Sequence, residues 1–147
     1  DEAKITVTQV PDRPGVAAAI FGPLAAANIN VDMIVQNVSV DGSSTDMTFT
    51  VPKPDLARAV QQLEHAKAEL KFAEVKSDLN VSKVSVIGVG MRSHAGVALK
   101  MFETLAANGI NIEMISTSAI RISVVVAGDQ CDQAVTVLHS AFGLDAA

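Results

Sequence analysis

The chain has 147 residues, of which 49% are hydrophobic and 18% charged, and its formal net charge is −5. This acidic balance and the absence of Tyr and Trp argue against a nucleic-acid surface, which needs clustered Lys and Arg and stacking aromatic side chains. No apolar run approaches the roughly 18 residues that span a bilayer, so we expect no membrane contact.

The first half of the chain predicts the element order β-α-β-β-α-β. Alternating apolar residues predict strands at 4–10, 31–40, 46–51 and 72–76, and helical periodicity predicts helices at 16–28 and 56–70. The cluster 41–44 predicts the turn of a hairpin, and we interpret Asp41 and Asp46 as turn residues. Pro23 lies inside the first predicted helix and should kink it or end it early.

The second half predicts the same order but lacks its last strand. We expect strands at 84–87, 112–116 and 120–127, a helix that begins after an N-cap at Ser93 and stops at Asn108, and a last helix capped by Asp129. Either the fourth strand lies outside this sequence or the sheet borrows one. The only credible boundary between the halves is 77–82, which gives domains 1–79 and 80–147.

A repeat relates the two halves. The segment 21–34 recurs at 102–115 with a constant offset of 81, and the copy includes the aromatic residue, Leu-Ala-Ala, Ile-Asn, an acid and Met-Ile. Internal duplication of this kind indicates two similar modules, each marginal alone at about 70 residues. We therefore predict an α+β fold of two ferredoxin-like units, each an antiparallel sheet with helices on one face.

Three further features bear on where the protein acts and with what. The single cysteine, Cys131, excludes an internal disulfide framework and indicates a cytoplasmic environment. The high apolar content predicts a subunit interface, and hence an oligomer. The sequence opens on Asp1 without Met and without a signal-peptide pattern, so we expect a fragment or a processed chain.

Catalytic, metal and nucleotide sites are all weakly supported. Gly88-x-Gly90 resembles the start of a dinucleotide fingerprint, but its third glycine position is Ser93. His94 next to Ser93 lacks an orienting partner for nucleophilic catalysis, and the three histidines lack metal-ligand spacing. We predict no catalytic residue, no metal site and no cofactor.

The loop that opens each first helix is the stronger candidate. Free amides at a helix start attract a carboxylate, and an acid on the following strand would pair with an ammonium group. Short polar side chains follow both helices: Asn30, Asp32 and Gln36 in the first half, and Asn111, Glu113, Thr117 and Ser118 in the second. This pattern suits a free amino acid. The alternative is that these side chains only cap elements and satisfy the hairpins.

Several runs of residues resemble the paired ACT domains of aspartate kinases. Residues 10–17 (Val-Pro-Asp-Arg-Pro-Gly-Val-Ala), 30–39 and 45–50 resemble the first domain. Residues 83–97, which contain Gly-Met-Arg-Ser-His, and 112–118 with 120–123 resemble the second. The similarity covers nearly the whole chain. It implies tandem ACT domains that form the regulatory subunit or domain of the kinase and have no catalysis of their own.

The resemblance also implies partners and ligands. Members of the family pair their ACT domains between chains as a homodimer, work with a catalytic aspartate kinase α subunit, and bind threonine, lysine or both for feedback inhibition. Carried over by position, the threonine-like pocket would contain Asp12, Gly15, Ala17, Gln36, Asn111 and Ile112. The lysine-like pocket would contain Asp32, Met91, Ser93, His94, Gly96, Val97 and Ser118.

One position departs from the family pattern. Ala119 stands where the family usually has Glu, and an unpaired, desolvated ammonium group costs about 1–3 kcal/mol or more. Either lysine binding is weakened or a neighbouring acid such as Glu113 substitutes.

Two other hypotheses for the function of the chain remain open. One is a stand-alone amino-acid sensor or dimerisation module of another enzyme. The other is an acylphosphatase-type hydrolase, for which Arg13 and Arg92 lack a convincing partner.

Overall fold

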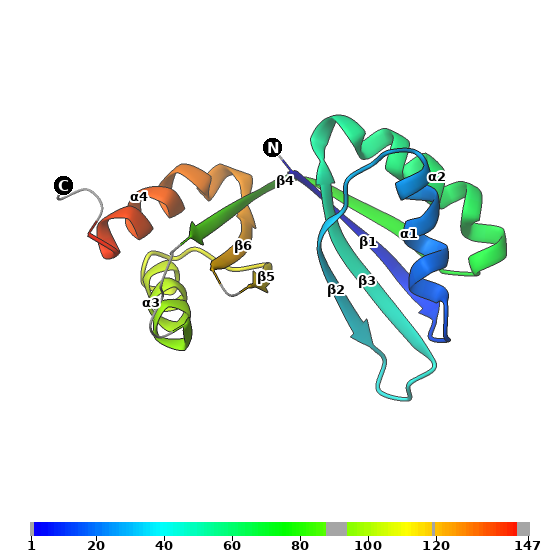
Figure 1. Cartoon of the computed structure of the whole chain (residues 1–147), viewed down its shortest axis with the longest axis horizontal. Helices are drawn as coiled ribbons and strands as arrows, with labels where there is room; N and C mark the ends of the chain where they lie inside the picture. Colours follow the sequence, from blue (N-terminus) through cyan, green and yellow to red (C-terminus); the bar gives the residue numbers. More distant parts are fainter. Residues whose placement is uncertain (1, 88–93, 119, 144–147) are drawn as a thin grey trace. The chain divides into compact units, whose positions relative to one another are not determined.

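The computed structural model describes residues 2–87, 94–118 and 120–143. The chain divides into two compact units, Asp1–Leu79 and Asn80–Ala147, called unit 1 and unit 2 below. Figure 1 shows that strand β4 is the element in which one unit passes into the other along the chain.

Unit 1 has the predicted ferredoxin-like order. It consists of β1 (Glu2–Pro11), α1 (Val16–Ala26), β2 (Asp32–Val38), β3 (Ser44–Pro52), the short 3-10 turn η1 (Lys53–Asp55), α2 (Leu56–Leu70) and the first part of β4 (Glu74–Ile87). The strands lie in the order β2-β3-β1-β4, and β3 pairs antiparallel with both β1 and β2. Beta-branched residues at alternate positions explain why these segments form strands with one apolar face.

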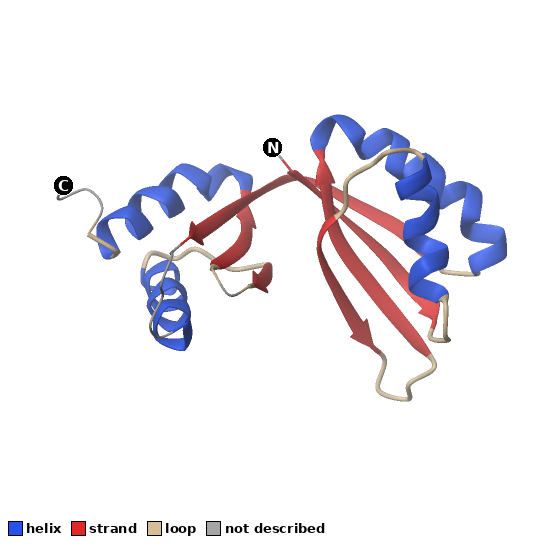
Figure 2. Ribbon diagram, viewed as in Figure 1, coloured by secondary structure: helices blue, strands red, loops and turns tan. Residues whose placement is uncertain are grey.

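The core of unit 1 lies between this sheet and its two helices, which cover one face (Figure 2). It contains Ile5, Val7, Met47, Phe49 and Val51 from the strands, Ile20 and Leu24 from α1, and Ala59 and Leu63 from α2. The rings of Phe21 and Phe49 meet edge to face with centroids 5.1 Å apart. The opposite face carries polar side chains, including the hydroxyl pair of Thr6 and Thr48, whose oxygens are 3.1 Å apart.

Unit 2 repeats this plan with three strands in its described residues. It consists of the second part of β4, α3 (His94–Ala107), β5 (Met114–Thr117), β6 (Arg121–Ala127), the 3-10 turn η2 (Gly128–Gln130) and α4 (Cys131–Ala141). The strand order is β4-β6-β5, and both pairings are antiparallel. Its core contains Met101, Leu105, Ile122, Val124, Val126 and Leu138. The hydroxyl pair recurs as Ser85 and Ser123, 2.7 Å apart.

The structure differs from the sequence-based predictions at four places. The strand expected at 72–76 begins at Glu74 and continues to Ile87, because alternating β-branched residues run on through 81–87 without a turn signal. Helix α1 continues through Pro23 but ends at Ala26, short of Asn28, which has φ 60°. The expected Asp129 cap is wrong, because Asp129 lies inside η2 and α4 begins after Gln130. Strand β5 begins at Met114, two residues later than expected.

Candidate functional site

The start of α1 is an open helix N-terminus. Gly15 precedes the helix with φ 86°, in the left-handed region. The amide of Val16 donates to the carbonyl of Arg13 at 3.2 Å, and the amide of Ala19 donates to Gly15 at 3.0 Å. Among the described residues, no acceptor is recorded for the amides of Ala17 and Ala18, and no side chain caps the helix. Donors in this position favour a carboxylate.

Gln36 and Asp12 lie on the same side of unit 1 as this helix start. The amide of Asp12 donates to the carbonyl of Ser43 at 3.2 Å, which holds the loop before α1 against the hairpin. Gln36 lies directly opposite Met47 across the β2–β3 ladder. Opposed residues share a face of the sheet, and Met47 is buried on the face that the helices cover. Gln36 is itself exposed, at the edge of the sheet, where a ligand could reach it.

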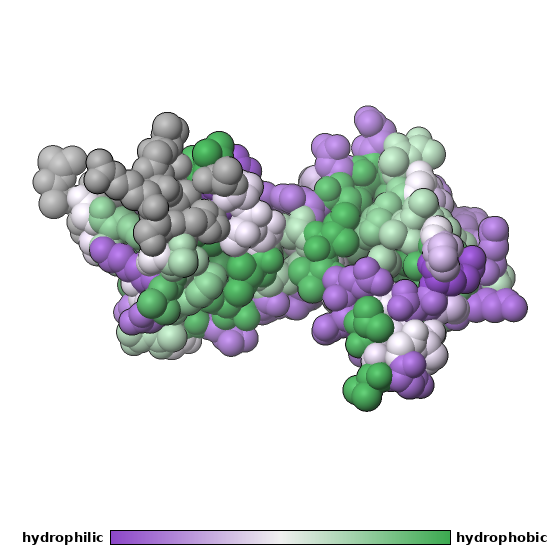
Figure 3. All heavy atoms as spheres, turned by 60° about the horizontal axis from the view of Figure 1, so that its bottom comes forward, coloured by the Kyte–Doolittle hydropathy of each residue, from purple (hydrophilic) through white to green (hydrophobic). Residues whose placement is uncertain are grey.

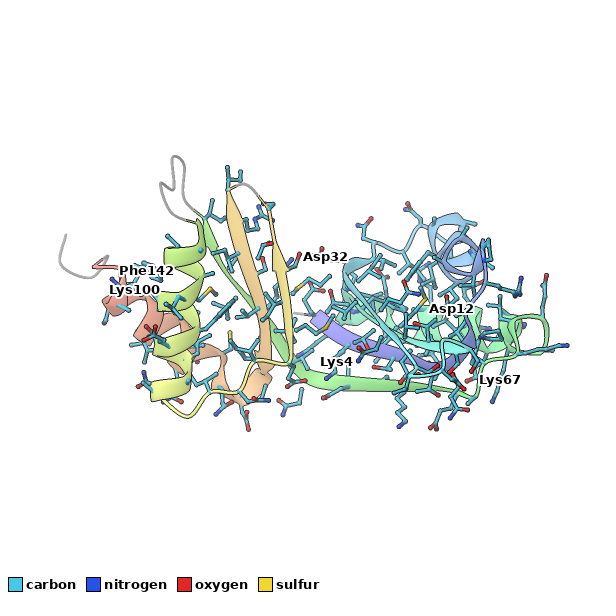
Figure 4. The ribbon with its side chains drawn as sticks, turned by 90° about the horizontal axis from the view of Figure 1, so that it is seen from below. Lys4, Asp12, Asp32, Lys67, Lys100 and Phe142 are labelled. Atoms are coloured by element: carbon cyan, nitrogen blue, oxygen red, sulfur yellow. The ribbon has the colours of Figure 1, made fainter. Side chains whose placement is uncertain are left out.

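Asp32 lies at the other end of the sheet. Strands β1 and β2 both pair antiparallel with β3, so they run parallel to one another. Asp12 follows the end of β1, whereas Asp32 is the first residue of β2 and lies opposite Thr50. Figure 4 labels the two carboxylates well apart on unit 1. The two acids, assigned to different pockets from the sequence, therefore lie at opposite ends of the sheet, and the pockets themselves stay a prediction.

Two strained bulges lie close to these acids in the chain, one at Gln9 before Asp12 and one at Met33 directly after Asp32, and the sequence did not predict either. Gln9 has φ 53° and Met33 has φ 50°, and each coincides with a shift of register. The amide of Gln9 donates to a carboxylate oxygen of Asp46 at 2.8 Å, and the amide of Met33 donates to Asp32 at 2.8 Å. Bulges of this type re-aim a strand and gather near functional sites. Asp46 is thus a strand residue that holds a bulge, and its interpretation as a turn residue is wrong.

The predicted site residues of unit 2 are only partly within the described chain. Met91 and Ser93 lie outside it, as does the predicted Ser93 N-cap, and His94 is the first residue of α3. Gly96 is exposed in the first turn of that helix, and Val97 packs against the core of unit 2. The amide of Ser118 donates to the carbonyl of Arg121 at 2.8 Å in the β5–β6 turn.

Asn111 and Ile112 lie between α3 and β5. Asn111 is exposed, whereas Ile112 is partly buried against the core of unit 2. Both predicted pockets would combine residues of unit 1 with residues of unit 2, and this grouping stays a prediction.

One carboxylate has a perturbed pKa. Hydrogen bonds from the amide and hydroxyl of Ser43, and then from the hydroxyl of Ser39, lower the pKa of Asp41 to about 2. Asp41 therefore locks the β2–β3 turn, as predicted, and is too exposed and too acidic for proton transfer near pH 7. Within the described ranges, no three His, Cys, Asp or Glu side chains come together, and no helix is both long and apolar enough to cross a membrane.

Apolar side chains reach the surface of both units (Figure 3). On edge strand β2, Ile34 is 52% exposed, and its repeat counterpart Ile115 on edge strand β5 is 46% exposed. Beside Ile34, a hollow of about 320 Å³ is lined by Phe21, Ala25, Asn28, Ile29, Asn30 and Val31. The duplicated segment therefore forms an exposed, partly apolar sheet edge as well as core.

The fold and the sequence matches together define a protein with tandem ACT domains. The ACT-domain family model matches residues 4–66, and a second ACT-domain model matches residues 84–142. The chain is 56% identical over 146 residues to an aspartate kinase of Stutzerimonas stutzeri, and 49% identical over 144 residues to an aspartokinase of Mycolicibacterium smegmatis. It covers 35% and 34% of those relatives, so it spans about a third of their length.

Two solved structures of aspartate kinase subunits match over almost their whole length. A structure of aspartokinase alpha and beta subunits is 48% identical with a TM-score of 0.89, and the match covers 96% of this chain and 92% of that one. The ligand-free regulatory subunit of aspartate kinase from Thermus thermophilus is 41% identical with a TM-score of 0.88, covering 96% and 93%. The chain therefore belongs to the aspartate kinase family, as its regulatory ACT-domain pair.

Proposed function

We propose that this chain senses threonine at ACT–ACT interfaces and so mediates allosteric feedback inhibition of an aspartate kinase catalytic subunit. The observation that carries the proposal is the match to the regulatory subunit of aspartate kinase, which includes 96% of this chain and 93% of that one. Nearly all of this chain thus corresponds to a regulatory subunit, and we assign catalysis to an aspartate kinase catalytic subunit in the cytoplasm.

The helix start of unit 1 supports an amino-acid ligand. The amides of Ala17 and Ala18 would bind the ligand carboxylate, helped by the positive end of the α1 dipole. Asp12 and Gln36, on the same side of the unit, would accept from the ammonium group or the threonine hydroxyl. Asn111 and Ile112 of the second domain would complete the pocket.

The duplicated sheet edge supports a homodimer. Ile34 and Ile115 occupy equivalent positions in the repeat and are both about half exposed on edge strands. Edge strands expose unpaired backbone groups as well as side chains, so pairing them side by side would cover both. A ligand bound at such a junction would contact two chains.

Inhibition would follow from the thermodynamic linkage between effector binding and the arrangement of the kinase. An effector can shift the equilibrium between two arrangements of the kinase only by its differential affinity for them. A ratio of ten in affinity supplies about 1.4 kcal/mol, and a hundredfold ratio about 2.8 kcal/mol. A pocket completed by two chains provides such a difference, because it exists only in the paired arrangement.

Titration calorimetry of the full-length protein with threonine and with lysine tests the proposal. We expect threonine to bind and lysine to bind more weakly, because Ala119 supplies no carboxylate for the lysine side chain. Gln36→Met should weaken threonine binding about 10- to 100-fold, since it removes one hydrogen bond to a charged or polar group. Gln61→Met, on the exposed face of α2, should leave it unchanged. No heat with either amino acid from a folded dimer would refute the proposal.

The partner is tested separately. We expect the catalytic aspartate kinase chain to be part of the same polypeptide or to co-purify with it, and light scattering to show two copies of the regulatory pair. A monomer that binds threonine but never associates with a kinase would instead support the stand-alone sensor.

A further inference from the structure

The chain leaves α3 through the Asn-Gly pair at 108–109. Gly109 has φ 70°, in the left-handed region, and its amide donates back to a carbonyl of the helix at 3.1 Å. The next amide, that of Ile110, donates to the carbonyl of Leu105 at 2.9 Å. A left-handed residue with such backward hydrogen bonds is a common way for a helix to end. The turn directs the chain into the segment that contains Asn111.

Two glutamine side chains donate to the carbonyls of this turn. Nε2 of Gln130, at the end of η2, lies 3.3 Å from the carbonyl oxygen of Gly109. Nε2 of Gln133, in the first turn of α4, lies 3.4 Å from the carbonyl oxygen of Asn108. Carbonyls at the C-terminus of a helix have no partner within the helix, so side-chain donors can satisfy them. Gln130 and Gln133 are called the glutamine pair below.

Unit 1 provides an internal reference for this contact. Helices α2 and α4 align at an offset of 75, which places Leu63 opposite Leu138 (138 − 63 = 75), and both leucines are buried in the core of their own unit. At the same offset Arg58 corresponds to Gln133 (133 − 58 = 75). The two residues therefore occupy equivalent positions near the start of the second helix of each unit.

Unit 1 makes the same contact with a charged donor. Ala27 corresponds to Asn108 at the offset of 81 (108 − 27 = 81). Nη1 of Arg58 donates to the carbonyl of Ala27 at 2.8 Å, and Nη2 of Arg58 forms a salt bridge with Asp55 at 2.8 Å. Both units thus connect the end of the first helix to the second helix through a side chain at the same position. The contact is common to the two units although the residue types differ, which indicates that the contact itself has a role.

The segment after the turn in unit 2 is held at both ends. At its start the side chain of Ile110 is buried in the core of the unit. At its end the amide of Glu113 donates to the carbonyl of Val125 on β6 at 2.8 Å. Asn111 lies between these two points and is exposed. A binding segment that already has its bound conformation loses little conformational freedom when a ligand arrives, and this preserves affinity.

We propose that Gln130 and Gln133 are positioning residues, which hold the segment 109–112 in the conformation that presents Asn111 to an amino-acid ligand. The inference rests on the proposed function, in which Asn111 contributes to the threonine pocket. The glutamine pair acts through the carbonyls at 108–109 rather than through contact with the ligand. It raises the fraction of the protein in which the segment already has the binding conformation, and the apparent affinity is proportional to that fraction.

Hydrogen–deuterium exchange of the full-length protein without ligand tests whether the glutamine pair holds the turn. The double variant Gln130→Met/Gln133→Met keeps the length of both side chains and removes both donors. We expect the amides of Gly109 and Ile110 to exchange about three- to tenfold faster in this variant, since the turn loses two neutral hydrogen bonds. Exchange of the amide of Glu113 should change far less, because β6 holds it. Equal exchange of Gly109 and Ile110 in both proteins would overturn the proposal.

Calorimetric titration of the same proteins with threonine tests the effect on the ligand. The double Met variant should bind threonine about three- to tenfold more weakly than the wild-type protein. Gln130→Met/Gln133→Arg supplies the donor that unit 1 uses, so it should restore most of the affinity and the slow exchange of the turn. Gln61→Met, at an exposed position of α2, is the matched control and should change neither the affinity nor the exchange.

The outcomes separate this inference from the proposed function. A wild-type protein that binds no threonine would refute both. A wild-type protein that binds threonine, with a double Met variant that exchanges faster at the turn but binds equally well, would overturn only the inference about the glutamine pair. So would failure of the Gln133→Arg substitution to restore affinity while it restores slow exchange, because the held turn would then have no effect on the ligand.

Discussion

Gly15 has an unusual backbone conformation and directly precedes the helix start of the candidate site. Gly15→Ala therefore tests both features with one substitution. With φ 86° and ψ −7°, Gly15 has a left-handed conformation that L side chains rarely adopt. No heavy atom lies within 4 Å of the place where a Cβ would be. Any effect of this substitution therefore comes from the backbone rather than from a clash.

The magnitude follows from two opposing contributions. A left-handed conformation costs a non-glycine residue roughly 1–2 kcal/mol. Replacing Gly by Ala also restricts the unfolded chain, which returns about 0.4–1 kcal/mol. We expect Gly15→Ala to lower the free energy of unfolding of unit 1 by about 1 kcal/mol. Gly22→Ala is the control, because Gly22 lies within α1 without a positive φ. Its gain of about 0.5–1 kcal/mol in helix propensity is offset in part by Pro23, whose ring crowds a Cβ on the preceding residue, so we expect a change of less than about 0.5 kcal/mol.

Urea unfolding followed by circular dichroism at 222 nm measures both variants, since the chain lacks the Tyr and Trp that fluorescence needs. Hydrogen exchange of the α1 amides separates unit 1 from unit 2. The same two proteins titrated with threonine show whether the helix start holds the ligand, because only Gly15→Ala should weaken binding. A Gly15→Ala variant no less stable than Gly22→Ala would refute the conformation assigned to Gly15.

Three further predictions concern the turn, the cores and the helix junction. Asp41 should show a pKa of about 2 in a carbon NMR titration. Its ionised carboxylate therefore contributes fully to the free energy of unfolding above pH 3.8, and this contribution is lost as the pH falls toward 2. A measured pKa close to 3.8 would contradict the turn geometry. Leu63→Ala and Leu105→Ala each remove a buried side chain and should each cost about 2–5 kcal/mol, with faster exchange confined to the unit that carries the change. Arg58→Met removes a 2.8 Å hydrogen bond to the carbonyl of Ala27 at the end of α1, and should lower the free energy of unfolding by at most about 1 kcal/mol.

Local patterns in the sequence were sufficient for the repeated plan and for part of the site. The offset of 81 between the two halves, the alternation along β1 and β3, and the Pro-Gly loop before α1 all act within a few residues. They predicted the ferredoxin-like order and the helix start at Gly15. The position of Gln36 on the helix-covered face follows from its pairing with Met47, which only the register of the ladder establishes.

Strand pairing decided the remaining features, because it depends on residues far apart in the chain. Gln9 and Met33 take positive φ values where β1 and β2 shift register against β3, and their residue types give no sign of this. The continuation of β4 through Asn80 depends on its partner changing from β1 to β6. The sequence alone thus determined the two modules and their elements, whereas only the tertiary structure decided where strands bulge, which acids share an end of a sheet and which edge stays open.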